Sequence, residues 1–273
     1  MEIGILGPLV ISKNEPPRYV ELAPKPRTVL ALLLSNAGGI LPASSLVREV
    51  WGDAPPVSAL RSIQTYVLQS RKVLSQLTGA PVRVVAGEML LTRPGGYTFS
   101  DAAGQFDYRR YLELAEPGRR VIREGALAEG IDLLTRALAS WRGPAFVDIV
   151  TGPALESQRI QLEESRLGVV EILSEVRIRV GHYHEALSDL AVAVSEYPLH
   201  EGLNYQYMRV LDIVGSRARA LEVFSRLRLN PRCSSCSTGS STPGTLTTPP
   251  RTRRRRAGWC ERSRGPVAVR TSH

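Results

Sequence analysis

The chain has 273 residues, of which 43% are hydrophobic, and 35 basic against 26 acidic side chains give it a net charge of +9. This length suits two domains of ordinary size. No apolar stretch approaches the roughly 18 residues of a membrane span, and the first residues, MEIGILGPLVI, lack the basic segment and cleavage site of a signal peptide. The sequence therefore predicts a cytoplasmic protein that does not associate with a membrane.

The positive charge is concentrated at one end of the chain. Residues 229–273 contain nine arginines and a single acidic residue, whereas the first 228 residues contain 26 basic and 25 acidic side chains. Within those 228, residues 1–100 carry 10 basic and 6 acidic side chains, so the front is mildly basic and the rear mildly acidic. The total charge is therefore weak support for nucleic-acid binding, because its distribution matters more than its sum.

The first hundred residues contain predicted strands, three helices and a hairpin. IGILGPLVI and YVEL are strand-like runs. KPRTVLALLLSNAG and PASSLVREVWG predict two helices that end at glycine, and the rigid loop DAPPV separates them from a third helix at residues 58–77. VRVVAG and MLLTRPGGYTF predict strands, the second broken by a Pro-Gly-Gly turn. This order is typical of an α+β winged helix-turn-helix.

The third helix has one apolar and one polar side. At 100° per residue, the apolar arc holds Leu60, Ile63, Val67, Leu74 and Leu77. The opposite arc contains no acidic residue and consists of Ser58, Arg61, Ser62, Thr65, Gln69, Lys72 and Gln76. Such side chains hydrogen-bond to base edges and phosphates in the major groove. The polar side is either a DNA-reading surface or an ordinary solvated face, and the surrounding order of elements favours the first.

From about Phe106 onwards the sequence changes to long amphipathic helices. Three segments are punctuated alike: EGALAEGIDLLTRAL, VGHYHEALSDLAVAV and VGSRARALEVFSRLR. Gly181 and Gly215, and likewise Ala186 and Ala220, are 34 residues apart. This period of helix pairs is typical of tetratricopeptide-type repeats. The segment is therefore predicted to be an all-α helical-repeat domain suited to contacts with other proteins.

The composition of residues 229–273 predicts a disordered tail. They are rich in Ser, Thr, Pro and Arg, and they contain too few aliphatic side chains to offset the chain entropy by burial. Cys233 and Cys236 have the spacing of zinc and redox sites, but no second pair or nearby histidine completes a ligand set. The run RTRRRR could bind nucleic acid nonspecifically. Alternatively the tail is read out of frame, which is the interpretation favoured here.

The sequence offers no residues for catalysis. It lacks the phosphate-binding, metalloprotease, hydrolase and dinucleotide motifs. His182 and His184 diverge on a helix, so they are expected to be exposed at a repeat turn rather than to share a metal. Glu163 and Glu164 lie among arginines and are interpreted as ordinary surface charges. We therefore expect neither an enzyme nor a cofactor or metal site.

Two blocks of sequence together resemble a known family. LVREVWGDAPPVSALRSIQTYVLQSRKVL followed by LLTRPGGYTF resembles the OmpR-like winged-helix domain of Streptomyces antibiotic regulatory proteins. ALASWRGPAFVDI, RIQLEESRLGVVEI and EYPLHEGLNYQYMRVLDIVGSRARALEVFSRLR resemble the bacterial transcriptional activation domain that follows it. The resemblance implies a winged-helix domain at residues 1–100 and an activation domain at 106–228. It also implies an activator, usually of secondary-metabolite genes such as those for antibiotics, that binds promoter direct repeats and recruits RNA polymerase.

The resemblance further implies which residues contact double-stranded DNA. The helix at residues 58–77 corresponds to the recognition helix, whose groove- or phosphate-facing residues would be Arg61, Ser62, Thr65, Gln69 and Lys72. Gln69 stands where related domains often have a basic residue, and it could pair with adenine. Leu68 is either a contact to a thymine methyl group or a packing residue. Arg93 corresponds to the wing arginine that enters the minor groove.

The chain departs from the family after Arg228, where members usually continue with further helical sequence. The arginine-rich tail in this place indicates a C-terminally truncated or frameshifted member, in which DNA binding could survive alone. The loop GDAPPV corresponds to the one that contacts RNA polymerase, and direct repeats would suit two copies arranged head to tail. The alternative function is a helical-repeat adaptor that binds a protein and has no specific DNA target.

Overall fold

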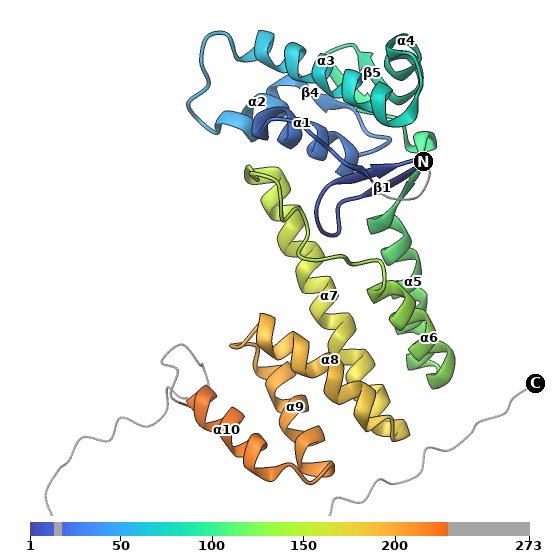
Figure 1. Cartoon of the computed structure of the whole chain (residues 1–273), viewed down its shortest axis with the longest axis vertical. Coiled ribbons are helices and arrows are strands. Elements are labelled where there is room, and N and C mark those ends of the chain that lie inside the picture. Colours follow the sequence, from blue (N-terminus) through green and yellow to red (C-terminus); the bar gives the residue numbers. More distant parts are fainter. Residues whose placement is uncertain (14–17, 229–273) are drawn as a thin grey trace, which may run out of the picture. The chain divides into compact units, whose positions relative to one another are not determined.

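A computed structural model describes residues 1–13 and 18–228 (Figure 1). Its first sheet has the strand order β3-β2-β1-β7. β1 (Glu2–Gly4) and β2 (Val10–Ser12) are antiparallel, so IGILGPLVI forms two strands joined by a turn. β3 (Arg18–Tyr19) extends the sheet beyond β2, and β7 (Gln105–Phe106) pairs in parallel with β1.

Three helices follow, as the sequence predicts. α1 (Pro24–Ser35) carries an unbroken run of buried aliphatic side chains from Val29 to Leu34, which places it at the centre of the core. It contacts both α2 (Ala43–Trp51) and α3 (Ala59–Thr78). α2 and α3 end at glycines with positive φ, a backbone conformation that glycine adopts without steric cost.

The predicted hairpin is confirmed. β4 (Leu41–Pro42), β5 (Leu90–Arg93) and β6 (Gly96–Phe99) form a second sheet in the order β4-β6-β5. The β5–β6 turn contains Gly95, whose φ is +81°. The three helices and this sheet together form the expected winged helix-turn-helix, in which the β5–β6 hairpin is the wing.

The predicted strand at VRVVAG is wrong. This segment forms a short helix, α4 (Val82–Val84), that runs into a π-helical turn, η1 (Val85–Met89). Pro81 precedes them with a φ of −56°, which suits the start of a helix. Val85 is buried and Met89 is half-buried. Gly87, halfway between them, is exposed, whereas a strand would place all three on one face. The burial pattern therefore matches a helical turn, and packing overrides the β propensity of valine.

The predicted apolar side of α3 is confirmed except at its first turn. Ile63, Val67 and Leu74 are buried, and Leu77 is half-buried. The prediction is wrong for Leu60, which is 59% exposed, whereas the neighbouring Ala59 is buried. Helical side chains lean toward the N-terminus. Leu60 lies in the first turn, so its side chain points beyond the N-terminal end of the part of α3 that packs against the core.

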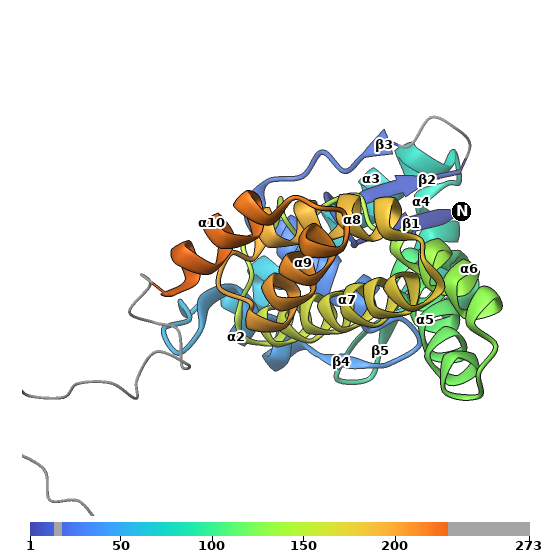
Figure 2. The same ribbon diagram turned by 90° about the horizontal axis from the view of Figure 1, so that it is seen from below.

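The remaining helices form successive pairs (Figures 1 and 2). After a 3₁₀ turn, η2 (Asp101–Ala103), the pairs are α5 (Asp107–Arg123) with α6 (Leu127–Leu138), α7 (Pro153–Val180) with α8 (Tyr183–Glu196), and α9 (Glu201–Ile213) with α10 (Arg217–Arg228). Gly125, Gly181 and Gly215 lie in the three turns, with φ of +94°, +85° and +80°. The left-handed conformation ends a helix, which explains the glycine that the three segments share.

The interpretation of Glu163 as a surface charge is wrong. Glu163 is 7% exposed, and its carboxylate accepts hydrogen bonds from the Ala145 N–H at 2.7 Å and the Tyr197 hydroxyl at 2.8 Å. Burial and the bond to Glu163 raise the pKa of Tyr197 to about 12. Both partners come from distant positions in the chain, so helical periodicity could not identify them. Glu164 and the histidines at 182 and 184 are exposed, as predicted.

A carboxylate of α2 holds the first turn of α7. Glu49 is 5% exposed and accepts hydrogen bonds from the N–H groups of Gly152, Ala154 and Leu155 at 2.8–3.0 Å. These are among the backbone donors that have no partner within their own helix at an N-terminus. The negative charge is also favourable there because of the helix dipole. The helix-turn-helix and α7, the longest of the described helices, are therefore joined directly.

Two further carboxylates accept hydrogen bonds from backbone N–H groups of the segment between β1 and β2. Asp107, at the start of α5, accepts from the N–H groups of Ile5 and Leu6 at 2.9 and 3.0 Å. Burial raises the pKa of Asp107, while these hydrogen bonds and Arg142 act in the opposite direction. Asp148 accepts from the Leu9 N–H at 2.9 Å.

The division into domains at residues 100 and 106 stays a prediction.

None of the helices within residues 1–13 and 18–228 is long and apolar enough to cross a membrane. The predictions for residues 229–273, namely disorder, the cysteine pair and a shifted reading frame, lie outside the described residues.

Candidate nucleic-acid interface

α3 presents the predicted polar stripe to solvent. Within it, Arg61, Thr65, Gln69 and Lys72 are exposed, and Ser62 is half-buried. The Ser62 and Thr65 hydroxyls donate to backbone carbonyls one turn earlier, at 3.2 and 3.1 Å, which leaves their lone pairs free to accept. α3 contains no acidic residue, so every charge on the stripe is positive.

Two exposed residues, Gln64 and Leu68, border this stripe without belonging to its predicted polar arc. Gln64 was missed because it follows the buried Ile63 directly and lies on the flank of the helix. Glutamine can bond an adenine edge with its amide, and this chemistry was the available signal. Leu68, one turn further on, is 47% exposed, which disfavours the packing alternative and leaves its methyl groups available for contact.

The buried side of α3 fixes its orientation. The Trp51 ring at the end of α2 stacks on Tyr66 with ring centroids 6.1 Å apart, and the Lys25 ammonium of α1 lies 5.0 Å from the centre of the Trp51 ring. Ile63 and Val67 reach into the core beneath them. Because α3 is held against its neighbours α1 and α2, its polar stripe does not have to become ordered when DNA binds. This lowers the free-energy cost of binding.

Arg71 connects α3 to the wing. Its Nε and Nη2 donate to the Leu90 carbonyl at 2.9 and 2.8 Å, and Nη2 also donates to the Thr92 hydroxyl oxygen at 2.9 Å. Burial lowers the pKa of Arg71. The same strand ends in Arg93, which is exposed. Arg71 thus brings the wing arginine and the stripe onto neighbouring elements, a positioning role that its sequence context did not reveal.

The described residues contain no group of three or more histidine, cysteine or acidic side chains that could hold a metal ion. The exposed side chains of the α3 stripe and the wing are cations, amides and hydroxyls, the groups that contact phosphates and base edges in DNA.

Comparison with known proteins identifies the family. Residues 16–99 match the family model "Transcriptional regulatory protein, C terminal", and residues 106–230 match "Bacterial transcriptional activator domain". Regulatory protein DnrI of Streptomyces peucetius is 38% identical over 228 residues, which cover 84% of each chain. The chain belongs to the Streptomyces antibiotic regulatory protein family. Members of this family are transcriptional activators that bind DNA and act with RNA polymerase.

Other relatives of the chain agree with the assignment. The transcriptional regulator RedD of Streptomyces coelicolor is 32% identical over 228 residues, covering 84% of the present chain and 64% of RedD. The solved structure of Mycobacterium tuberculosis EmbR in complex with a low affinity phosphopeptide has 27% sequence identity and a TM-score of 0.69. It covers 83% of the present chain and 58% of the EmbR chain. This likeness confirms the fold class, a winged helix followed by a helical domain.

Proposed function

We propose that this protein activates an antibiotic biosynthesis gene cluster in the cytoplasm by binding direct repeats in its promoter through α3 and the wing. The observation that carries the proposal is the acid-free, exposed stripe on a helix whose other side is locked into the core. Gln69 and Gln64 read base edges in the major groove, while Arg61 and Lys72 bind phosphates or guanine. Arg93 reaches the adjacent minor groove.

The proposal also assigns a surface to RNA polymerase. The loop at residues 52–57, between α2 and α3, is exposed over most of its length. It lies at the N-terminal end of α3, next to the DNA-reading stripe, so a polymerase subunit bound beside the promoter site can reach it. Two copies arranged head to tail on direct repeats would each present the same loop in the same direction.

Substitution of the two stripe cations tests the DNA-binding surface. Arg61→Ala and Lys72→Ala are each expected to weaken binding to the promoter of the neighbouring cluster by about 1 kcal/mol, roughly fivefold, in a gel-shift assay. The dependence of log affinity on log salt concentration should also decrease by about 0.9 for each lost phosphate contact. Arg83→Ala is the matched control, because Arg83 is an exposed arginine of α4 that lies outside the stripe.

The same assay distinguishes the alternatives. If both stripe variants keep wild-type affinity, the assignment of α3 as the recognition helix is wrong. If the wild-type protein shows no preference for promoter over random DNA, the helical-repeat adaptor becomes the better hypothesis. Insertion of about half a helical turn between the repeats should reduce binding by two copies, because it moves the second copy to the opposite side of the duplex.

A further inference from the structure

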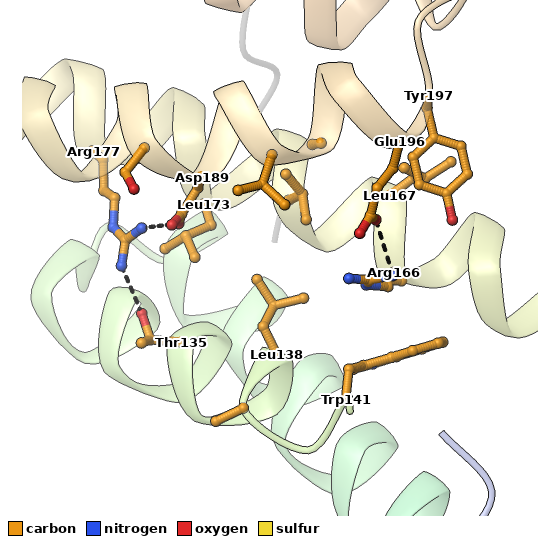
Figure 3. A pocket seen from close by; sticks show the side chains of 15 residues that line it. Thr135, Leu138, Trp141, Arg166, Leu167, Leu173, Arg177, Asp189, Glu196 and Tyr197 are labelled. Carbon is orange, nitrogen blue, oxygen red and sulfur yellow. Dashed lines mark hydrogen bonds and ion pairs between the residues drawn. The ribbon is translucent and has the colours of Figure 1, made fainter. Parts of the chain in front are cut away.

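A pocket lies between α6, α7 and α8, far along the chain from the proposed DNA-binding surface (Figure 3). Its volume is about 340 Å³. Small-molecule sites in proteins have volumes of about 300–1,000 Å³ and combine apolar walls with a few polar groups. Here the apolar wall comes from all three helices, with Leu138 of α6, Val170 and Leu173 of α7, and Val192 of α8.

One end of the pocket is closed by an arginine whose partners are complete. Arg177 of α7 forms an ion pair with Asp189 of α8 and donates to the Thr135 hydroxyl oxygen of α6 at 3.1 Å. Figure 3 shows the guanidinium between these two partners. Arg177 is 8% exposed. Its guanidinium links α6, α7 and α8, and the contacts described leave no donor of this arginine directed at a ligand. We interpret it as structural.

The other end contains an arginine, Arg166, that is held by ion pairs with Glu163 and Glu196 but has no hydrogen bond on Nη1. The Arg166 guanidinium lies 5.1 Å from the centre of the Trp141 ring, and its buried Nη1 makes no hydrogen bond. The nearest carboxylate oxygens belong to Glu196 at 3.4 Å and Glu163 at 3.8 Å. Glu163 is already engaged by Ala145 and Tyr197. Trp141 Nε1 is a second buried donor of this pocket without an acceptor.

A buried donor without an acceptor is costly, so this end of the pocket favours an occupant that supplies acceptor oxygens. Glu196 is the member of the cluster that a ligand can displace most easily, because its side chain is 42% exposed and it is the last residue of α8. A carboxylate can take its place on Arg166 in the bidentate geometry that arginine prefers. A dianion such as a phosphate monoester is disfavoured, since Asp189 lines the pocket and the Glu163 carboxylate lies 3.8 Å from Arg166 Nη1.

We infer that this pocket binds a small monocarboxylic acid with an apolar body, and that its occupancy is transmitted to the winged helix through α7. The carboxylate lies on Arg166, and the body lies against Leu138, Val170 and Leu173. The same helix that carries Arg166 has its first turn held by Glu49 of α2. If the ligand binds more tightly when α7 is in one placement than in another, it therefore changes the fraction of molecules that have each orientation of α2 and α3.

Calorimetric titration of the full chain tests the binding step without DNA. 2-Naphthoate and decanoate serve as the aromatic and aliphatic probes, and 2-naphthamide and 2-naphthyl phosphate as the neutral and dianionic analogues. We expect at least one carboxylate to bind with a dissociation constant below ~1 mM, and both analogues to bind at least about tenfold more weakly. No detectable binding of either carboxylate, or equal binding of the amide, overturns the assignment.

Three variants locate the site. Arg166→Gln is expected to weaken carboxylate binding at least about tenfold, and Arg166→Lys to restore part of it because the charge returns. Ala139→Phe fills the pocket from an exposed position at the end of α6, where the fold tolerates a larger side chain, and should abolish binding. Arg179→Gln is the matched control on the exposed side of α7. Wild-type affinity in Ala139→Phe would place the ligand elsewhere.

A gel shift with and without a saturating carboxylate probe tests the transmission step, which rests on the proposed function. Promoter affinity should change at least about fivefold in the wild-type protein and not in Arg166→Gln. Unchanged affinity in a protein that binds the probe overturns transmission through α7. Absence of any specific DNA binding instead contradicts the proposed function, and calorimetry still decides whether the pocket takes a carboxylate.

Discussion

Replacement of Glu49 by alanine is expected to lower the free energy of unfolding by about 2–4 kcal/mol. The substitution removes the single acceptor of three backbone N–H groups at the start of α7, two of them within 2.8 Å of its oxygens. Gly152, whose N–H is one of the three, is packed so tightly against α2 that a side chain there would meet the Glu49 backbone. Leu155, which carries another of the three N–H groups, is buried, so water cannot easily replace the lost carboxylate at that donor.

Urea denaturation followed by circular dichroism measures this effect. Glu49→Gln keeps the shape and one acceptor oxygen but loses the charge, so its stability should lie between those of the wild type and Glu49→Ala. Glu88→Ala removes an exposed carboxylate and serves as the control. A loss of less than about 0.5 kcal/mol in Glu49→Ala, the range of ordinary surface substitutions, would show that the α2–α7 junction is not held by this carboxylate.

Gly96→Ala is expected to damage the wing. Gly96 begins β6 opposite Pro42, and a Cβ atom at this position would overlap the backbone carbonyl of Leu41 in β4. Because a carbonyl in a strand pair cannot move away as a flexible side chain can, the β4–β6 pairing must open, at a cost of about 1–3 kcal/mol. Arg93 lies opposite Gly96 in the β5–β6 pair, so its position changes as well.

The expected result is a lower urea midpoint together with promoter affinity reduced by about tenfold, as for the loss of one good contact to DNA. Gly87→Ala is the control, since a Cβ atom at Gly87 meets nothing within 4 Å. Full DNA affinity in a Gly96→Ala protein that is measurably destabilised would mean that the wing does not contribute to binding.

Features that depend on local backbone preference could be predicted from the sequence. The three helices of the front part, the β5–β6 hairpin and the paired helices after Phe106 all follow from periodicity and from glycines that the structure places at positive φ. The polar stripe of α3 also follows from helical periodicity. Four of its five predicted contact residues are exposed. Their contacts with DNA remain a prediction.

Features that depend on distant partners could not be predicted. Glu49 and Glu163 look like other helical carboxylates until Gly152, Ala145 and Tyr197 are brought to them by folding. Arg71 has the same sequence signature as a DNA-contacting cation, yet its guanidinium is directed to β5. The strand predicted at VRVVAG was wrong because valine favours strands only where a neighbouring strand is available to pair with it.

The hydrogen bonds accepted by Glu49, Asp107 and Asp148 have a practical consequence for dissecting the molecule. A fragment ending at residue 100 would lack β7 beside β1, and it would leave these acceptors or their donors without partners. It would also lose Phe146 and Leu155, which belong to the same buried cluster as α1 and α3. We therefore expect the smallest DNA-binding fragment that folds on its own to extend into α7, well past the last strand of the wing.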